Sequence, residues 1–142
     1  MRTDYCIAFA FSDDNKEVAL IKKNRPHWQK DKYNGIGGKI NEGELPIEAI
    51  VREFNEETNC IAYNFLKFAI LDFSNALVHC YKLNISLELL ESPTDEIVEI
   101  FPVDNLPKNL VNDVAWLVPM CTNSFYIHDI KISKPCPTTK KL

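Results

Sequence analysis

The sequence has only four glycines in 142 residues, and all of them lie between Gly35 and Gly43. Glycine loses more backbone freedom on folding than any other residue, so its concentration in one segment indicates unusual dihedrals or very close approach of a ligand. The rest of the chain contains no flexible linker and no internal repeat.

Basic clusters and long apolar runs are also lacking. The formal net charge is -4, which disfavours duplex nucleic acid or an anionic membrane as the main partner. A free nucleotide neutralised by a metal ion remains compatible with this charge. No run approaches the ~20 apolar residues of a membrane span, and Asp4 interrupts the start, where a signal peptide would need an apolar segment. We therefore expect a cytoplasmic protein, and the sequence leaves its oligomeric state open.

The cysteines show no metal-binding or disulfide pattern. There are five of them, an odd number, widely spaced and without a Cys-x-x-Cys pair or a histidine at zinc-finger spacing. We interpret them as reduced thiols that serve as small apolar residues.

The length and a hydrophobic content of 46% predict one domain, which we place at residues 1–132. Residues 133–142, which carry prolines and lysines, are expected to form a mobile tail. Residues 23–43 are expected to be mostly loop, and a second helix is predicted over residues 110–120, where Pro119 should end or kink it. Short apolar runs predict strands over residues 5–11, 18–22, 61–73, 77–90, 97–101 and 125–132.

The clearest local prediction is a helix that begins at Pro46 and ends near Asn59, a residue that tolerates the left-handed conformation of a helix stop. Apolar residues at helical spacing fill an arc of about 100° on it. These residues are Ile47, Ile50, Val51, Phe54 and Thr58. Three acids occupy the adjoining arc, namely Glu53, Glu56 and Glu57.

The three acids project as neighbours from successive turns, because they are three or four residues apart. Two like charges about 4 Å apart repel by about 4 kcal/mol at an effective dielectric constant near ~20. A divalent cation would remove this repulsion, and Mg²⁺ prefers hard oxygen ligands while it shares its other positions with substrate phosphates. A solvated acidic face paired with nearby lysines is the alternative.

A longer pattern surrounds these acids. From Gly38, five residues lead to Glu44, and seven more lead to the run Arg52-Glu53-Phe54-Asn55-Glu56-Glu57-Thr58-Asn59-Cys60. This closely resembles the signature of the Nudix hydrolases, Gly-x5-Glu-x7-Arg-Glu-U-x-Glu-Glu-x-Gly-U, where U is a bulky aliphatic residue. Phe54 and Cys60 are apolar substitutes at the U positions, and Asn59 replaces the glycine of the family.

The resemblance implies an α/β fold, an α/β/α sandwich around a mixed β-sheet in which the motif forms a loop, a helix and a loop. It also implies a bound Mg²⁺ or Mn²⁺, held by Glu53, Glu56 and Glu57 with the carbonyl group of Gly37. Arg52 is expected to orient those carboxylates. The general base stays open between Glu53, Glu44 and Glu96, and Glu96 is either an additional metal ligand or an ordinary exposed turn acid.

Two further segments resemble the MutT branch of the family, which hydrolyses oxidised purine nucleoside triphosphates. They are Lys32-Tyr33-Asn34-Gly35-Ile36-Gly37-Gly38-Lys39 and Leu110-Val111-Asn112-Asp113-Val114-Ala115-Trp116. Amides and a carboxylate can present donors and acceptors to a purine edge, so Asn34, Asn112 and Asp113 are the expected base-reading residues. Contacts to the phosphates or to the face of the base are expected from Lys23, Lys39, Gly38, Trp28 and Tyr33.

The leading hypothesis is a metal-dependent pyrophosphohydrolase that converts a (deoxy)nucleoside triphosphate to a monophosphate and pyrophosphate, with 8-oxo-dGTP-like compounds among the candidates. A broader hydrolase of nucleoside diphosphates linked to another group, such as nucleotide sugars or general deoxynucleotides, is one alternative. A nucleotide sensor without turnover is the other, and the intact glutamate set disfavours it.

Overall fold

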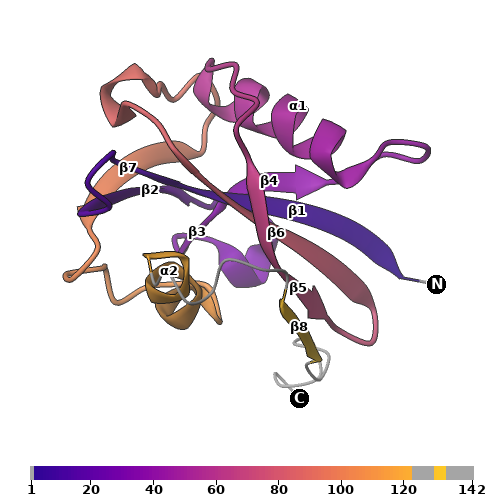
Figure 1. Cartoon of the computed structure of the whole chain (residues 1–142). Helices are drawn as coiled ribbons and strands as arrows, with labels where there is room; N and C mark the ends of the chain where they lie inside the picture. The colour runs from indigo at the N-terminus through magenta and orange to yellow at the C-terminus, as the bar shows by residue number, and fades with distance from the viewer. Residues whose placement is uncertain (1, 123–129, 134–142) are drawn as a thin grey trace.

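A mixed β-sheet lies between two helices in the computed structural model, which describes residues 2–122 and 130–133 (Figure 1). Helix α1 (Pro46–Thr58) covers one face of the sheet and α2 (Val114–Thr122) covers the other. The strands are β1 (Thr3–Phe11), β2 (Glu17–Lys22), β3 (Tyr33–Asn34), β4 (Ile36–Lys39), β5 (Leu66–Asp72), β6 (Ala76–Asn84), β7 (Ile97–Pro102) and β8 (Ile130–Ser133). Two short 3₁₀ helices span His27–Gln29 and Leu87–Leu89. The predicted α/β/α sandwich is confirmed.

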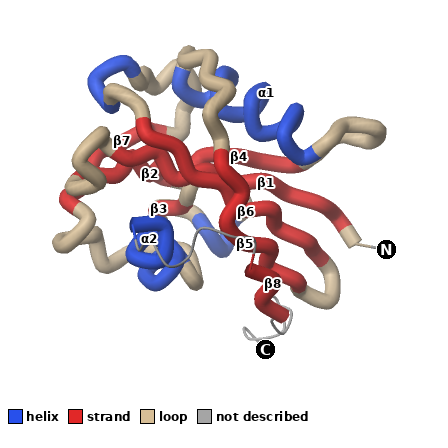
Figure 2. Tube along the Cα trace, in the orientation of Figure 1, coloured by secondary structure: helices blue, strands red, loops and turns tan. Residues whose placement is uncertain are grey.

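Strand β1 is the centre of the sheet (Figure 2). It pairs in parallel with β6 along its whole length, and antiparallel with β2 at one end and β4 at the other. The sheet continues from β6 through β5 to β8, which is parallel to β5, while β7 pairs antiparallel with β2. Because β3 and β4 are separated by a single residue, one stretch of chain crosses from β2 to β1 and brings the glycine segment to the middle of the sheet.

The central strands are apolar on both faces because a helix covers each face. Successive residues of β1 alternate between two clusters, with Ala8 facing α1 and Phe9 facing α2. On the first face the core includes Ile50 and Phe54 of α1, and on the second it includes Leu117 of α2. This alternation explains why the predicted strands are nearly continuous apolar runs.

Local chemistry sets both ends of α1. Pro46 occupies the first turn, and the side chain of Glu48 accepts a hydrogen bond from the backbone N–H of Leu45 at 2.9 Å. Asn59 has a φ of 62° and donates its N–H to the carbonyl of Asn55, so the predicted left-handed stop is confirmed. The buried face of α1 differs from the predicted apolar arc at Ile47, which lies in the first turn and is 40% exposed.

Several predicted elements differ from the structure. Residues 33–39, expected to be loop, form β3 and β4, and residues 61–65 precede β5 without strand structure. Helix α2 begins at Val114 instead of residue 110, because Asp113 has a φ of 80° and cannot continue a right-handed helix. Pro119 lies inside α2 and does not end it.

The C-terminal predictions are only partly covered by the described residues. Of the strand predicted over residues 125–132, the structure describes Ile130–Ser133 as β8, and residues 134–142 of the expected tail lie outside the described residues. The predicted domain boundary therefore stays a prediction. Three of the cysteines, Cys6, Cys80 and Cys121, are buried free thiols, which agrees with their interpretation as apolar residues.

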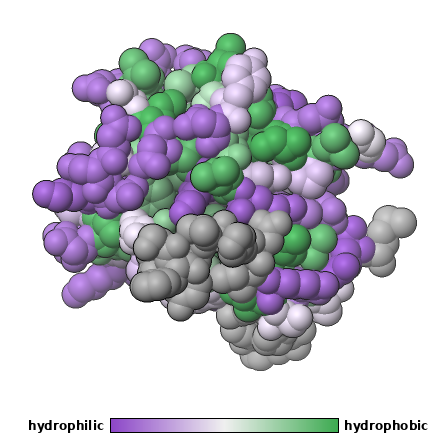
Figure 3. Space-filling view, in the orientation of Figure 1, coloured by the Kyte–Doolittle hydropathy of each residue, from purple (hydrophilic) through white to green (hydrophobic). Residues whose placement is uncertain are grey.

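The surface is mixed in character. Figure 3 shows hydrophilic side chains gathered toward the β2 and β7 side of the face seen in Figure 1, with apolar side chains between hydrophilic ones elsewhere. Within the described part of the chain, no helix is long and apolar enough to cross a membrane.

Candidate active site

The three acids of α1 differ in their burial. At about 100° per residue, Glu57 lies within about 20° of the core residue Ile50, and Glu53 lies further round the helix. The side chain of Glu56 is 55% exposed, whereas that of Glu53 is 15% exposed. Burial raises the pKa of Glu57 to about 7, although the positive charge of Lys23 opposes the shift. Burial also raises the pKa of Glu53, again as the largest cause.

Arg52 joins the acids into one network. Its guanidinium forms a two-pronged pair with Glu44, with Nε to Oε2 at 2.8 Å and Nη2 to Oε1 at 2.9 Å. Nη1 donates to Glu53 at 2.9 Å and to Glu56 at 3.3 Å, and Nη2 also donates to the carbonyl of Lys39 at 3.1 Å. The pair with Arg52 lowers the pKa of Glu44 to about 2. Arg52 therefore holds the loop before α1 and two acids of the helix in a fixed arrangement.

Gly37 and Gly38 bring the backbone of β4 against these acids. The N–H of Gly37 donates to Oε1 of Glu57 at 3.0 Å. A Cβ atom on Gly37 would lie 2.0 Å from the carbonyl oxygen of Cys6, and one on Gly38 would lie 2.7 Å from the carboxylate of Glu53. A side chain at Gly37 would clash with fixed backbone, and one at Gly38 would displace the carboxylate of Glu53, which explains why glycines are concentrated here.

A cleft of about 590 Å³ begins at this glycine pair and runs along the face of the sheet that α2 covers. Its wall is largely apolar, with Val78 of β6 and Leu117 of α2. Polar groups also line it, among them Lys23, which follows β2, and Asp113, which precedes α2. None of the three acids of α1 is among its described lining residues. A pocket with an apolar wall and a few polar groups is typical of small-molecule sites.

Five of the predicted substrate-binding residues line this cleft. They are Lys23, Asn34, Gly38, Asn112 and Asp113. Trp28, the other predicted stacking residue, also lines it. Tyr33 was expected to contact the base, but it is not among the described residues that line the cleft. It is 7% exposed, its ring packs edge-on against Phe101, and its hydroxyl donates to Glu99 at 2.6 Å. Lys39 is exposed and is also absent from the described residues that line the cleft.

The cleft also contains residues that the sequence did not single out. Gln29 and Arg25 line it, because the segment after β2 folds back along the cleft before β3. The Oε1 atom of Gln29 accepts a hydrogen bond from Nδ2 of Asn34 at 3.4 Å, while Oδ1 of Asn34 accepts one from the N–H of Gly35 at 2.7 Å. No spacing rule identifies Gln29, since its position depends on the path of an irregular loop.

Glu96, the predicted additional acid, is 4% exposed and is therefore not an ordinary exposed turn acid. Its Oε1 atom accepts a hydrogen bond from Nζ of Lys23 at 3.0 Å. Its Oε2 atom accepts from the backbone N–H groups of Asn24 at 2.7 Å and Arg25 at 3.2 Å. The predicted metal and base roles of Glu96 stay predictions.

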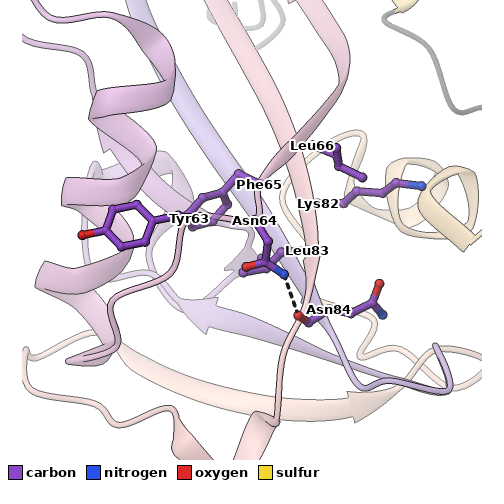
Figure 4. A pocket seen from close by; sticks show the side chains of 7 residues that line it. All are labelled: Tyr63, Asn64, Phe65, Leu66, Lys82, Leu83 and Asn84. Carbon is purple, nitrogen blue, oxygen red and sulfur yellow. Dashed lines mark hydrogen bonds between the residues drawn. The ribbon is translucent and has the colours of Figure 1, made fainter.

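A second hollow, of about 400 Å³, lies on another part of the surface (Figure 4). Figure 4 shows that its residues come from the segment before β5, the first residue of β5 and the end of β6. Asn64 donates across it to the carbonyl of Asn84 at 3.0 Å, and Nζ of Lys82 bonds to the carbonyl of Cys121. None of its described lining residues is acidic, so it lacks the carboxylates that would neutralise the charge of a divalent cation.

The donor set on α1 fits a divalent cation such as Mg²⁺. Glu53 and Glu57 offer hard oxygen atoms beside the backbone of Gly37, and their raised pKa values indicate that burial penalises the carboxylates as they stand. Arg52 relieves part of the predicted repulsion between Glu53 and Glu56. In the described part of the chain no three acidic, histidine or cysteine side chains are grouped closely enough to hold a metal ion by themselves. Mg²⁺ usually takes one or two carboxylates and completes its shell with water and substrate phosphates.

Comparison with known proteins agrees with this geometry. The NUDIX domain family matches residues 1–120. The fold is similar to the MutT protein from Bacillus halodurans, with a TM-score of 0.73, 18% identity, and coverage of 96% of this chain and 92% of that one. It is also similar to the MutT NUDIX hydrolase from Burkholderia pseudomallei, with a TM-score of 0.68, 21% identity, and coverage of 84% and 97%.

A third similar structure is the NUDIX domain of NrtR from Shewanella oneidensis, determined in complex with ADP ribose. Its TM-score is 0.70 at 17% identity, with coverage of 84% of this chain and 85% of that one. Together with the acids of α1 and the glycine pair of β4, the family match establishes the class of the protein. The chain belongs to the NUDIX domain family and has the fold of the Nudix hydrolases, which act on phosphorus anhydrides.

Proposed function

We propose that this protein is a divalent-metal-dependent pyrophosphohydrolase that cleaves a (deoxy)nucleoside triphosphate to a monophosphate and pyrophosphate. The first candidates for its substrate are oxidised purine forms such as 8-oxo-dGTP. The observation that carries the proposal is the placement of one cleft between two kinds of group. Its lining includes Gly37 and Gly38, which approach Glu57 and Glu53 of α1, and it also includes the polar side chains of Asn34 and Asp113.

The acidic end has the groups that hydrolysis of a phosphate chain requires. We propose Glu53, Glu56 and Glu57 as metal ligands, with the carbonyl group of Gly37 beside them. A metal ion bound there would polarise phosphoryl oxygens and neutralise charge on the departing pyrophosphate. Arg52 keeps the carboxylate of Glu53 in place through its bond at 2.9 Å.

The proton acceptor is proposed to be Glu53. The carboxylate of Glu53 lies against Gly38, which lines the cleft, so it is placed to take a proton from a water molecule bound there. Glu44 is less suited to that role because its pair with Arg52 lowers its pKa to about 2. We propose that Glu44 instead anchors Arg52, whose Nε and Nη2 atoms both point to it.

The other end of the cleft supports recognition of a purine. Asn112 is exposed and Asp113 half-buried at the start of α2, so both can reach a ligand in the cleft. A carboxylate accepts hydrogen bonds while an amide can both donate and accept, and such a set can distinguish the edges of the bases. The half-buried Trp28 offers an aromatic surface against which a base can stack.

A substrate panel with Mg²⁺ tests the proposal. The panel contains the normal and the 8-oxidised deoxynucleoside triphosphates, ADP-ribose and a nucleotide sugar, with products separated by ion-exchange chromatography. The proposal expects monophosphate and pyrophosphate, with oxidised purines cleaved fastest. Equal rates on all triphosphates would remove the preference for oxidised purines, and faster cleavage of ADP-ribose would favour a hydrolase of other nucleoside diphosphate compounds.

ADP-ribose belongs in the panel because the similar NUDIX domain of NrtR was determined in complex with it. Tight binding of a nucleotide without turnover would instead favour a sensor. We place the enzyme in the cytoplasm as part of the same proposal, supported by the free thiols of Cys6, Cys80 and Cys121.

A further inference from the structure

The carboxylate of Glu96 is directed at one short segment of chain. It lies just before β7, and its own N–H donates to Oγ1 of Thr94 at 3.0 Å. One carboxylate oxygen accepts from Nζ of Lys23, and the other accepts from the N–H groups of Asn24 and Arg25. Both oxygens of a buried acid are therefore used to hold residues 23–25.

Residues 23 and 25 form part of the wall of the cleft near Gly37 and Gly38. The side chain of Lys23 is 15% exposed, so most of its flexible stem is enclosed. An ammonium group has three donors. Among the described residues it forms one hydrogen bond, to Glu96, which leaves donors for an anion in the cleft. A lysine whose charge is fixed in advance loses less entropy when it binds a phosphate.

We propose that Glu96 is a positioning residue, which holds the ammonium group of Lys23 and the backbone of residues 24–25 at the phosphate end of the cleft. The inference rests on the proposed function, because it takes the bound anion to be the phosphate chain of a nucleotide. It differs from the predicted role of Glu96 as a metal ligand. In that role the loss of the charge would weaken metal binding, whereas in a positioning role it weakens nucleotide binding.

The exchange Glu96→Gln separates these two roles, because it keeps the size of the side chain and removes its charge. If Glu96 positions Lys23, KM for the nucleotide rises about tenfold, which is the scale of one charge-assisted hydrogen bond. We expect kcat to change by less than about threefold and the Mg²⁺ concentration for half-maximal rate to stay the same. Two results would overturn the proposal. One is an unchanged KM for the nucleotide with a higher Mg²⁺ requirement, and the other is an unchanged KM with an unchanged Mg²⁺ requirement.

Asp95→Asn is the matched control. Asp95 is the neighbouring acid and pairs with Arg25 at 2.6 Å, but both side chains are largely exposed, at 60% and 63%. Exposed ion pairs contribute little, so we expect KM to stay within about twofold of the wild-type value. If Asp95→Asn raised KM as much as Glu96→Gln does, a general loss of negative charge near the cleft would explain both effects, and the proposal would be overturned.

A double-mutant cycle tests whether Glu96 acts through Lys23. Lys23→Gln alone should raise KM, and Glu96→Gln added to it should raise KM no further, because the group that Glu96 positions is already gone. If the two effects multiply, Glu96 acts on something other than Lys23 and the proposal fails.

A chemical measurement tests the same contact without any substrate. Acetylation of Lys23 by an N-hydroxysuccinimide ester, followed by mass spectrometry of peptides, should be about tenfold faster in Glu96→Gln. The nitrogen must give up a proton to attack the ester, and in this variant it is no longer held in an ion pair with the carboxylate of Glu96. Asp95→Asn should react at the wild-type rate. If the wild-type protein hydrolyses nothing in the panel, the proposed function fails, and this labelling still decides the role of Glu96.

An unchanged labelling rate at Lys23 in Glu96→Gln would overturn the inference. If Glu96→Gln folds too poorly to be measured, Glu96→Asp replaces it, because it keeps the charge and shortens the side chain by one methylene. The proposal then expects KM to rise and labelling of Lys23 to become faster, as in Glu96→Gln, but by smaller factors. Wild-type values for both in Glu96→Asp would overturn it.

Discussion

Replacing each of three glycines by alanine should have three different effects, since the added methyl group meets a different neighbour at each position. At Gly37 the new Cβ would lie 2.0 Å from the carbonyl oxygen of Cys6 and 2.8 Å from Cα of Ile7. Ordinary contacts of this kind are 3.4–4 Å, and both neighbours are backbone atoms of β1 that no rotamer change can move. Strands β1 and β4 must separate where Ile7 pairs with Gly37.

We expect Gly37→Ala to reduce the free energy of unfolding by about 3 kcal/mol, at the upper end of the cost of overpacking. At about 3 °C per kcal/mol for a chain of this size, the melting temperature falls by about 10 °C. Gly38→Ala should keep its melting temperature within about 3 °C, because its Cβ meets the movable end of Glu53 at 2.7 Å. Displacing that carboxylate should lower kcat/KM about 100-fold.

Gly43→Ala is the control for backbone conformation alone. Gly43 has a φ of 81°, and a Cβ there would meet none of the described atoms within 4 Å. It should lose about 1 kcal/mol of stability and keep its activity. The assays are thermal denaturation followed by circular dichroism, and the triphosphate hydrolysis of the panel. A wild-type melting temperature in Gly37→Ala, or a wild-type kcat/KM in Gly38→Ala, would refute the argument from close approach.

Three other predictions concern the loop and helix of the motif. The pKa of Glu44 is lowered from 4.5 to about 2 in the folded state, so its stabilising effect is present above pH 4.5 and is lost as pH falls toward 2. In urea denaturation, Glu44→Gln should be less stable than the wild type at pH 7, and the gap should shrink at pH 3. At Asn59, whose φ is 62°, an alanine should cost about 1 kcal/mol and a glycine almost nothing, which urea denaturation also measures. Glu56→Gln and Glu57→Gln should each lower kcat by about 100-fold or more with unchanged circular dichroism, and full activity in both would refute their role.

Helix α1 could be predicted from the sequence because its signals are local. Pro46 marks its start, Asn59 marks its end, and the apolar spacing between them needs no tertiary information. The burial of Glu57 could not be predicted from its spacing alone, because Glu56 follows the buried Ala49 by the same seven residues and is exposed. The helical spacing places the acids beside the apolar arc but does not show which of them is most buried. That depends on how closely β4 packs against α1.

Features that depend on distant contacts could not be predicted. Strands β3 and β4 are two and four residues long, and half of β4 is glycine, so they show no alternation. Tyr33 was expected to contact the base, but its ring packs against Phe101 and its hydroxyl bonds to Glu99, contacts between distant strands that the sequence alone does not reveal. The start of α2 was missed because residues 110–114 carry apolar residues at helical spacing, whereas Leu110 bridges to Tyr33 and Asp113 has a φ of 80°.

The account depends most on the acids of α1 taking up a divalent cation beside a nucleotide. Isothermal titration calorimetry with Mg²⁺ or Mn²⁺, in the presence of a non-hydrolysable triphosphate analogue, measures this directly. We predict saturable uptake by the wild-type protein and at least about tenfold weaker uptake by Glu57→Gln, which removes one carboxylate ligand. No uptake by the wild type, or equal uptake by both proteins, would contradict the account.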